Sequence, residues 1–291
     1  MIRTVGLQKR YGDTVAVAGV DLDVPTGSIY GLVGPNGAGK TTLLGMLAGL
    51  RHPTAGIIEL EVARRRVGVL PDTPHFDPWL TAWEILDLAR TLVDPGIPRE
   101  RSDELLHDTG LEEAADRTVG GFSRGMLQRL GVASTLVGNP ELVLLDEPCA
   151  ALDPLGRREV LDLIARLRRS ATVVFSSHIL ADVQEVCDTV AILRQGSLLF
   201  QGPLEDLLVG KAVPRYLVRL RSDAMPAAAA LRHHPWVTGV EERGDLLRVG
   251  VESLARAEEE LPGALAAAGA VVVSMGPEAA SLEDVFLEVM A

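Results

Sequence analysis

Gly34-Pro-Asn-Gly-Ala-Gly-Lys-Thr41 is the stretch that decides the fold of this chain. It matches G-x-x-x-x-G-K-[ST], follows an apolar run that predicts a strand over residues 28–33, and leads into a predicted helix over residues 41–50. Its glycines allow the backbone to close tightly around phosphate oxygens, and the positive end of the following helix favours the same anion. We therefore expect a loop that binds a nucleoside triphosphate.

The positions of this loop have different expected roles. Lys40 adds a positive charge for the β- and γ-phosphates, and the Thr41 hydroxyl is a ligand for Mg²⁺. The other positions are expected to contact the nucleotide, mostly through the main chain: Gly34, Pro35, Asn36, Gly37, Ala38, Gly39 and Thr42. A glycine-rich turn with a chance lysine is the alternative, and the strand–loop–helix context disfavours it.

A second acidic site ends the run Leu142-Val-Leu-Leu-Asp146-Glu147. An uninterrupted apolar run suits a parallel strand buried on both faces, and ligands bind at the carboxyl ends of such strands. Asp146 is expected to hold Mg²⁺, and Glu147 is expected to act as the general base toward the attacking water. An exposed acidic turn is the alternative, which the phosphate loop upstream disfavours.

Composition and charge limit the class of protein. The chain has 291 residues, is 47% hydrophobic and 23% charged, and carries a net charge of −12, which argues against a nucleic-acid partner. Its two cysteines, Cys149 and Cys187, form no metal or disulfide pattern and fit a reducing compartment. No signal peptide is recognisable, and the longest uncharged stretch, 261–277, fits a helix and a strand better than a membrane span. We expect a cytoplasmic protein with at most a peripheral membrane role.

Alternating strand-like and helical patterns predict an α/β domain over residues 1–210, with a helical subdomain at about 75–137. Strands are expected at 28–33, 67–70, 142–145, 172–176 and 189–193. Helices are expected at 41–50, 81–92, 99–109, 123–137, 154–169 and 179–187, with Ser123 as a cap and Pro154 in a first turn.

The pattern changes after about residue 209 and predicts a small α+β domain over residues 211–291, joined by a linker from Gly210 to Pro214. Its expected order, β-α-β-β-α-β with a last helix, matches the ferredoxin-like pattern. The elements are expected at 215–221, 225–233, 237–243, 246–251, 254–268, 270–275 and 281–290.

A short motif before the acidic strand makes the resemblance specific. Phe122-Ser-Arg-Gly-Met126 begins a predicted helix, and the order of all these motifs resembles the nucleotide-binding subunit of ABC transporters over about residues 1–208. The motif resembles the family signature Leu-Ser-Gly-Gly-Gln, which caps the γ-phosphate held by a second copy. The resemblance implies such a contact for Ser123, Arg124, Gly125 and Met126, of which Arg124 and Met126 depart from the signature.

The same resemblance gives roles to four further residues. Asp153 matches the loop that couples the two sites of a dimer, although Asp153-Pro154 is also a plain helix start. His178 matches the switch histidine on the γ-phosphate, a catalytic role, and Tyr11 matches the aromatic that stacks on adenine, with a surface tyrosine as the alternative. Asp72 stands where the family usually has a glutamine that reaches Mg²⁺ and the attacking water. The aspartate side chain is shorter than that of glutamine and adds a negative charge.

The resemblance implies the α/β P-loop ATPase domain of that family, with a mixed sheet core and an antiparallel β part beside the helical subdomain. It also implies a head-to-tail homodimer that binds two ATP molecules with Mg²⁺ and drives separate permease subunits from the inner face of the membrane. The ending Ser281-Leu-Glu-Asp-Val-Phe-Leu-Glu288 is similar to that of type-2 ABC exporters. Trp79 and Trp83 share a helical face if their helix starts early, and subdomain packing and contact with a membrane subunit are equally open. Two alternatives are a non-transport ABC ATPase of DNA repair or translation and a small-molecule kinase.

Overall fold

The computed structural model describes residues 1–150, 152–168, 170–211, 214–278 and 282–290. They form two compact units, the first comprising Met1–Glu205 with Met290 and the second Asp206–Val289. The sequence placed this boundary at residue 210 with a linker to Pro214. The expected linker is wrong at its start, because helix α7 (Leu204–Lys211) continues through Gly210. Residues 212–213 of the expected linker lie outside the described residues.

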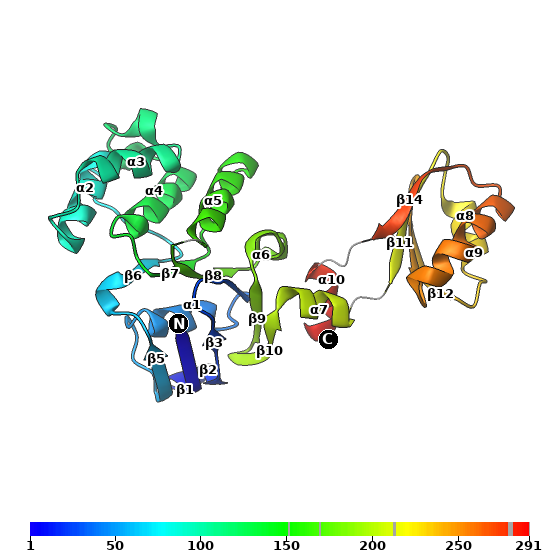
Figure 1. The fold of residues 1–291 in the computed structure, drawn as a ribbon, viewed down its shortest axis with the longest axis horizontal. Coiled ribbons are helices and arrows are strands. Elements are labelled where there is room, and N and C mark those ends of the chain that lie inside the picture. Colours follow the sequence, from blue (N-terminus) through cyan, green and yellow to red (C-terminus); the bar gives the residue numbers. More distant parts are fainter. Residues whose placement is uncertain (151, 169, 212–213, 279–281, 291) are drawn as a thin grey trace. The chain divides into compact units, whose positions relative to one another are not determined.

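A six-stranded sheet forms the centre of the first unit, in the order β10-β9-β4-β8-β7-β6 (Figure 1). All neighbours are parallel except β9 and β10, which are antiparallel. β4, β7 and β8 are buried along their whole length, which explains their unbroken apolar sequences. The strands span Ile29–Val33 (β4), Val67–Leu70 (β6), Leu142–Asp146 (β7), Thr172–Ser177 (β8), Thr189–Arg194 (β9) and Ser197–Pro203 (β10).

The register of this sheet brings the carboxyl ends of three strands together. Val33 of β4 pairs with Ser177 of β8, and Ser176 pairs with Asp146 of β7. The phosphate loop leaves β4 directly after Val33, and Glu147 follows Asp146. The parallel arrangement therefore places the loop and both carboxylates at one edge of the sheet, where α/β proteins bind ligands.

A second, antiparallel sheet is built around β1 (Ile2–Tyr11), which pairs with β2 (Thr14–Val20), β3 (Asp23–Val24) and β5 (Ala55–Leu60). The sequence predicted an antiparallel part without locating these strands. β1 changes register against both β2 and β5, and such irregularities break the simple alternation of inward and outward residues. One core joins this sheet to the central sheet and to helix α1 (Lys40–Leu47).

The other helices of the first unit begin and end within two residues of the predicted positions. They are α2 (Ala82–Val93), α3 (Glu100–Asp108), α4 (Arg124–Leu136), α5 (Pro154–Leu167) and α6 (Leu180–Val186). Thr81 and Glu84 form a capping box that starts α2. Trp79 therefore precedes the helix and is 69% exposed, whereas Trp83 lies within it and donates a hydrogen bond to Asp103. The expected shared helical face of the two tryptophans is wrong.

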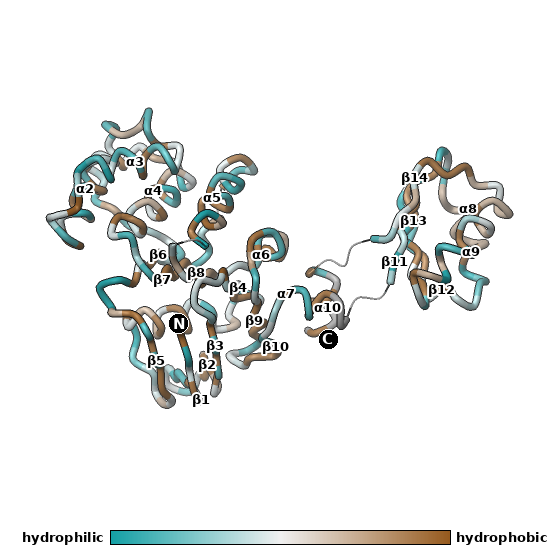
Figure 2. The backbone as a smooth tube through the Cα atoms, in the orientation of Figure 1, coloured by the Kyte–Doolittle hydropathy of each residue, from teal (hydrophilic) through white to brown (hydrophobic). Residues whose placement is uncertain are grey.

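The second unit has its own sheet, in the order β12-β13-β11-β14, with every pair antiparallel. Its core contains Trp236 and Tyr216, and Figure 2 shows apolar stretches in both units. The elements are β11 (Arg215–Leu220), α8 (Met225–Leu231), β12 (Val237–Arg243), β13 (Leu246–Val251), α9 (Leu254–Ala267), β14 (Val272–Glu278) and α10 (Leu282–Met290). None of the described helices is long and apolar enough to cross a bilayer.

Leu144 tests the central sheet, since its side chain is fully buried in β7. We expect Leu144→Ala to lower the free energy of unfolding by about 2–5 kcal/mol through lost burial and a residual cavity. Chemical denaturation measures the change. Leu92→Ala, at a position 77% exposed on α2, is the control and should change stability by less than about 0.5 kcal/mol. Equal effects of the two substitutions would contradict the described burial.

Candidate functional site

The phosphate loop has a shape that requires glycine. Gly37 and Gly39 adopt φ angles of 80° and 104°, which side chains rarely tolerate. A Cβ on Gly39 would lie 2.4 Å from the carbonyl oxygen of Ala16 on β2. The loop therefore packs directly against the antiparallel sheet, and its glycines allow both the turn and the close approach.

Lys40 at the start of α1 is a buried cation, with 6% of its side chain exposed. Its Nζ donates hydrogen bonds to the carbonyl oxygens of Gly34 at 2.8 Å and Pro35 at 3.4 Å. The Oε1 atom of Glu147 lies 3.5 Å from the same nitrogen. The loop and the acidic strand are thus joined through one ammonium group, whose buried charge is paired.

The two carboxylates after β7 are held by Ser176 of β8. The Ser176 hydroxyl donates a hydrogen bond of 2.6 Å to the buried carboxylate of Asp146 and accepts one of 2.9 Å from the Glu147 amide. Glu147 has a φ of 50°, and Gln128 of α4 donates to its carbonyl oxygen at 3.1 Å. A glutamate in this left-handed conformation is uncommon, and the surrounding hydrogen bonds keep it there.

His178 contacts the other carboxylate oxygen of Glu147. Its Nδ1 lies 2.8 Å from Oε2 of Glu147, and its ring is half exposed. The Glu147 carboxylate therefore lies between an ammonium group and an imidazole. This arrangement suits a group that accepts a proton when a ligand draws the two neighbours away.

These groups share one cavity of about 570 Å³. It is lined by Tyr11, Ala16, Asn36, Gly37, Ala38, Gly39, Lys40, Thr41, Thr42, Asp72, Glu147, Ala150 and His178. Three further residues are bonded to groups of this cavity. The carbonyl oxygens of Gly34 and Pro35 accept hydrogen bonds from Lys40. Asp146 accepts one from Ser176, whose hydroxyl also accepts one from the Glu147 amide. Tyr11 ends β1 at the cavity and is 45% exposed, so its ring is accessible to a ligand.

Three oxygen-bearing residues near the loop have the donor chemistry that Mg²⁺ prefers: Thr41, Asp72 and Asp146. Partial loss of hydration raises the pKa of Asp72, and the Asp146 and Glu147 carboxylates raise it further. Such concentrated negative charge favours a cation. The described residues contain no group of three or more metal-binding acids, histidines or cysteines. Nucleotide-bound Mg²⁺ usually needs only one or two carboxylates with phosphates and water, so these residues fit the ion.

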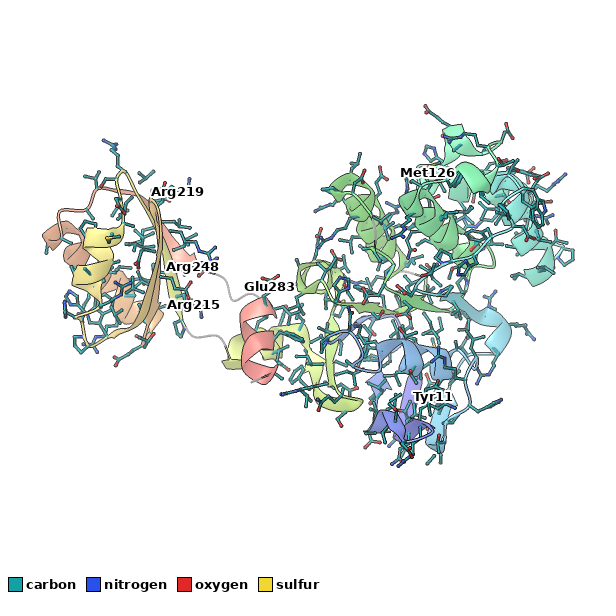
Figure 3. The ribbon with its side chains drawn as sticks, turned by 180° about the vertical axis from the view of Figure 1, so that it is seen from behind. Tyr11, Met126, Arg215, Arg219, Arg248 and Glu283 are labelled. Atoms are coloured by element: carbon teal, nitrogen blue, oxygen red, sulfur yellow. The ribbon has the colours of Figure 1, made fainter. Side chains whose placement is uncertain are left out.

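The expected signature residues line a different cavity, of about 480 Å³, at the starts of α4 and α5. Ser123 accepts a hydrogen bond from the Met126 amide and caps α4, as the sequence predicted, and Asp153 likewise caps α5. Figure 3 labels Met126 and Tyr11, which lie on separate parts of the first unit. Within one chain, therefore, Ser123, Arg124, Gly125, Met126 and Asp153 do not join the cavity of the phosphate loop.

Sequence reasoning missed several residues that shape this site. Ser176 and Gln128 position the carboxylates, and Arg51 donates a hydrogen bond to the Tyr11 hydroxyl. Arg157 of α5 pairs with the buried Asp182 of α6 and so joins the helices that follow Asp153 and His178. Only Ser176 had a signal in the sequence, because it stands at the end of a predicted parallel strand, two residues before His178.

Comparisons with known proteins agree on one family. The family model described as ABC transporter matches residues 17–150. An uncharacterized ABC transporter ATP-binding protein of Bacillus subtilis, YxlF, is 37% identical over 100% of this chain and 99% of its own. The Nod factor export ATP-binding protein I of Burkholderia orbicola is 38% identical over 67% of this chain and 68% of its own.

The fold is similar to that of a solved ATP-binding cassette, MJ0796, in a dimeric post-hydrolysis state bound to ADP and Pi. The TM-score is 0.65 at 25% identity, over 70% of this chain and 99% of that one. The similarity therefore covers a part of the chain about as long as the whole cassette.

Ser176 provides a test of how the carboxylates are held. We expect Ser176→Ala to lower the free energy of unfolding by about 1–3 kcal/mol, because the buried Asp146 carboxylate loses its hydrogen-bond donor. Thermal or chemical denaturation measures the loss. Ser197→Ala, at an exposed position of β10, is the matched control. A Ser176→Ala protein as stable as the control would show that this hydroxyl does not support the site.

Proposed function

This chain belongs to the family of ABC transporter ATP-binding proteins, and from that premise we propose that it hydrolyses ATP as a head-to-tail pair to drive export through separate membrane subunits. It is the ATP-binding component of such a transporter and an ATPase of that family. One observation carries the proposal for the site: Lys40, Glu147 and His178 converge at one cavity under the phosphate loop.

The contacts of Glu147 support a role as general base. In the structure its carboxylate is the partner of the buried Lys40 and of His178. We propose that the phosphates of ATP replace Glu147 as the partner of Lys40. Glu147 is then free to accept a proton from water, while His178 moves to the γ-phosphate. Tyr11 stacks on adenine, and the backbone amides of the phosphate loop bind the phosphate oxygens.

Mg²⁺ fits this site as the companion of ATP. Thr41 and Asp146 would hold the ion, and Asp72 would reach it through water. The ion would supply positive charge that offsets the charge on the phosphoryl oxygens. Asp72 then acts where the family usually has glutamine. Burial raises the pKa of Asp72, and the Asp146 and Glu147 carboxylates raise it further, so a bound cation would offset the charge of these groups.

The second cavity supports pairing of two copies. Ser123 and Gly125 lie at the start of α4, whose amides and positive end favour an anion. Since these residues do not reach the phosphate loop of their own chain, we propose that they cap ATP bound by a second copy. Arg124 and Met126 contribute to the same contact, and Asp153 lies beside it. The similar cassette MJ0796 has been solved as a dimer.

Glu147→Gln tests the catalytic assignment. We expect it to bind MgATP but to hydrolyse it at least about 100-fold more slowly, since the amide accepts no proton. Because ATP then persists, the variant should elute as a dimer from gel filtration with ATP and as a monomer without it. Phosphate release and elution volume are the measurements.

Glu141→Gln, at an exposed position just before β7, is the matched control and should keep wild-type turnover. Wild-type turnover of Glu147→Gln would refute the general base. If Glu147→Gln elutes as a monomer both with and without ATP, the kinase alternative is favoured instead. MgATP at one hundred times its Kd should also stabilise the wild type by about 2.7 kcal/mol, and no thermal shift would count against an intact ATP site.

An apolar groove of about 350 Å³ supports a permease partner. It lies between α2, β6 and the end of α4, and its lining includes Phe76, Leu88 and Leu92. Leu88 and Leu92 are exposed, as is Trp79 just before α2. We propose that a short segment of a membrane subunit docks here, on the cytoplasmic side. A relative is named for Nod factor export, and export by this chain is our proposal. These relatives disfavour a role in DNA repair or translation.

Leu92→Arg tests this groove. We expect it to leave the ATPase activity of the isolated chain unchanged, because Leu92 lies outside the ATP cavity. The same change should weaken co-purification with the cognate permease at least about tenfold, since a charge enters an apolar contact. Arg3→Glu, at an exposed position of β1, is the control. Unchanged co-purification of Leu92→Arg would remove the groove as a docking site.

The second unit is proposed to have a ferredoxin-like fold with an accessory role. Its β-α-β-β-α-β order and the antiparallel order β12-β13-β11-β14 support this identity. Of the exporter-like ending, Leu282–Met290 forms α10, and Ser281 lies outside the described residues.

A further inference from the structure

Tyr11 is held in place although nearly half of it is exposed. Its hydroxyl accepts a hydrogen bond of 2.9 Å from Nη1 of Arg51. The ammonium group of Lys9 lies 5.1 Å from the centre of the ring and donates to the carbonyl oxygen of His52 at 2.6 Å. An exposed aromatic ring usually turns freely, so two cations on one tyrosine at a ligand cavity call for an explanation.

Arg51 reaches Tyr11 because the chain reverses after α1. Gly49 adopts a φ of 75°, and the amides of Leu50 and Arg51 both donate to the carbonyl oxygen of Gly45, at 2.9 and 3.0 Å. This helix end anchors the backbone of Arg51 beside the helix that it has just left. The Arg51 side chain can then run back along α1 toward the phosphate loop.

Gly45 provides the space for that path. A Cβ at this position would lie 3.0 Å from both Cδ and Nε of Arg51. The stem of Arg51 therefore crosses the helix where a side chain is missing. Its Nη1 then lies 3.3 Å from the hydroxyl of Thr42 as well as 2.9 Å from that of Tyr11. Tyr11 and Thr42 both line the ATP cavity.

We propose that Arg51 is a positioning residue for nucleotide binding, which acts through Tyr11 on the base and not on the phosphates. This inference rests on the proposed stacking of adenine on Tyr11. The planar guanidinium fixes the tyrosine hydroxyl against the first turn of α1, so that the ring faces the ligand before the ligand arrives. Ordering the ring in advance lowers the entropy lost on binding.

The test compares a ligand that has a base with one that lacks it. Isothermal titration calorimetry would measure the Kd of MgATP and of magnesium tripolyphosphate for the wild type and for Arg51→Met, which keeps a stem over Gly45. We expect Arg51→Met to weaken ATP binding about 3- to 10-fold, which corresponds to the net contribution of one ordinary hydrogen bond, because Arg51 acts on the base only through Tyr11. Tripolyphosphate should bind equally well to both proteins. In turnover, KM for ATP should rise while kcat stays unchanged.

Two further variants separate positioning from folding. Gly45→Ala crowds the stem of Arg51 and should weaken ATP binding less than Arg51→Met does, although alanine favours a helix over glycine and should not lower stability. In a Tyr11→Phe background, which keeps the ring and removes the hydroxyl, Arg51→Met should cause no further loss. Arg3→Met, on the exposed side of β1, is the control for removing a positive charge.

Several outcomes would overturn the proposal. Equal losses for ATP and tripolyphosphate would mean that Arg51 acts on the phosphates by its charge. Unchanged ATP binding by Arg51→Met would also overturn it. So would an Arg51→Met substitution that weakens ATP binding as much in the Tyr11→Phe protein as in the wild type. Failure of the proposed function itself looks different, since the wild type would then bind neither MgATP nor tripolyphosphate.

Discussion

The site depends on one buried charge, the ammonium group of Lys40. A buried cation is costly unless it is paired, and here the carbonyl oxygens of Gly34 and Pro35 and the carboxylate of Glu147 satisfy it. The same nitrogen is the group expected to hold the phosphates of ATP. Binding is therefore an exchange of partners, in which a ligand anion replaces Glu147. The proposed base becomes available only when the ligand is present, which links occupancy of the loop to the chemistry.

The parallel sheet makes this exchange possible. Three neighbouring strands, β4, β8 and β7, end at the same edge because their register pairs Val33 with Ser177 and Asp146 with the preceding residue, Ser176. Ser176 then holds Asp146 and the amide of Glu147 at once. A strand buried on both faces cannot slip by one residue without moving all its side chains to the other face. The distance between Lys40 and Glu147 is thus fixed by the pairing of strands that are buried along their whole length.

This constraint also explains what the sequence could predict. Strands buried on both faces carry unbroken apolar runs, so β4, β7 and β8 were expected nearly at their observed bounds, as were their apolar neighbours β6 and β9. The antiparallel strands around β1 were not located, because their irregular register blurs the alternation of side chains. The motif residues of the cavity were named from spacing and resemblance. Arg51 and Gln128 were not, since no local pattern shows that a side chain reaches across a helix or a loop.

Two of the cavities in the first unit contain the expected nucleotide-contacting residues. One holds the phosphate loop with Lys40, and the other holds Ser123 and Asp153, each lined by groups suited to part of a bound nucleotide. The ion pair of Arg157 with the buried Asp182 joins α5, which Asp153 caps, to α6, which follows His178. A second copy seated on Asp153 would therefore act on a helix tied to the histidine that contacts Glu147. ATP bound at the phosphate loop would then affect the Glu147 carboxylate through Lys40. Pairing of the copies would affect the same carboxylate through α5, α6 and His178.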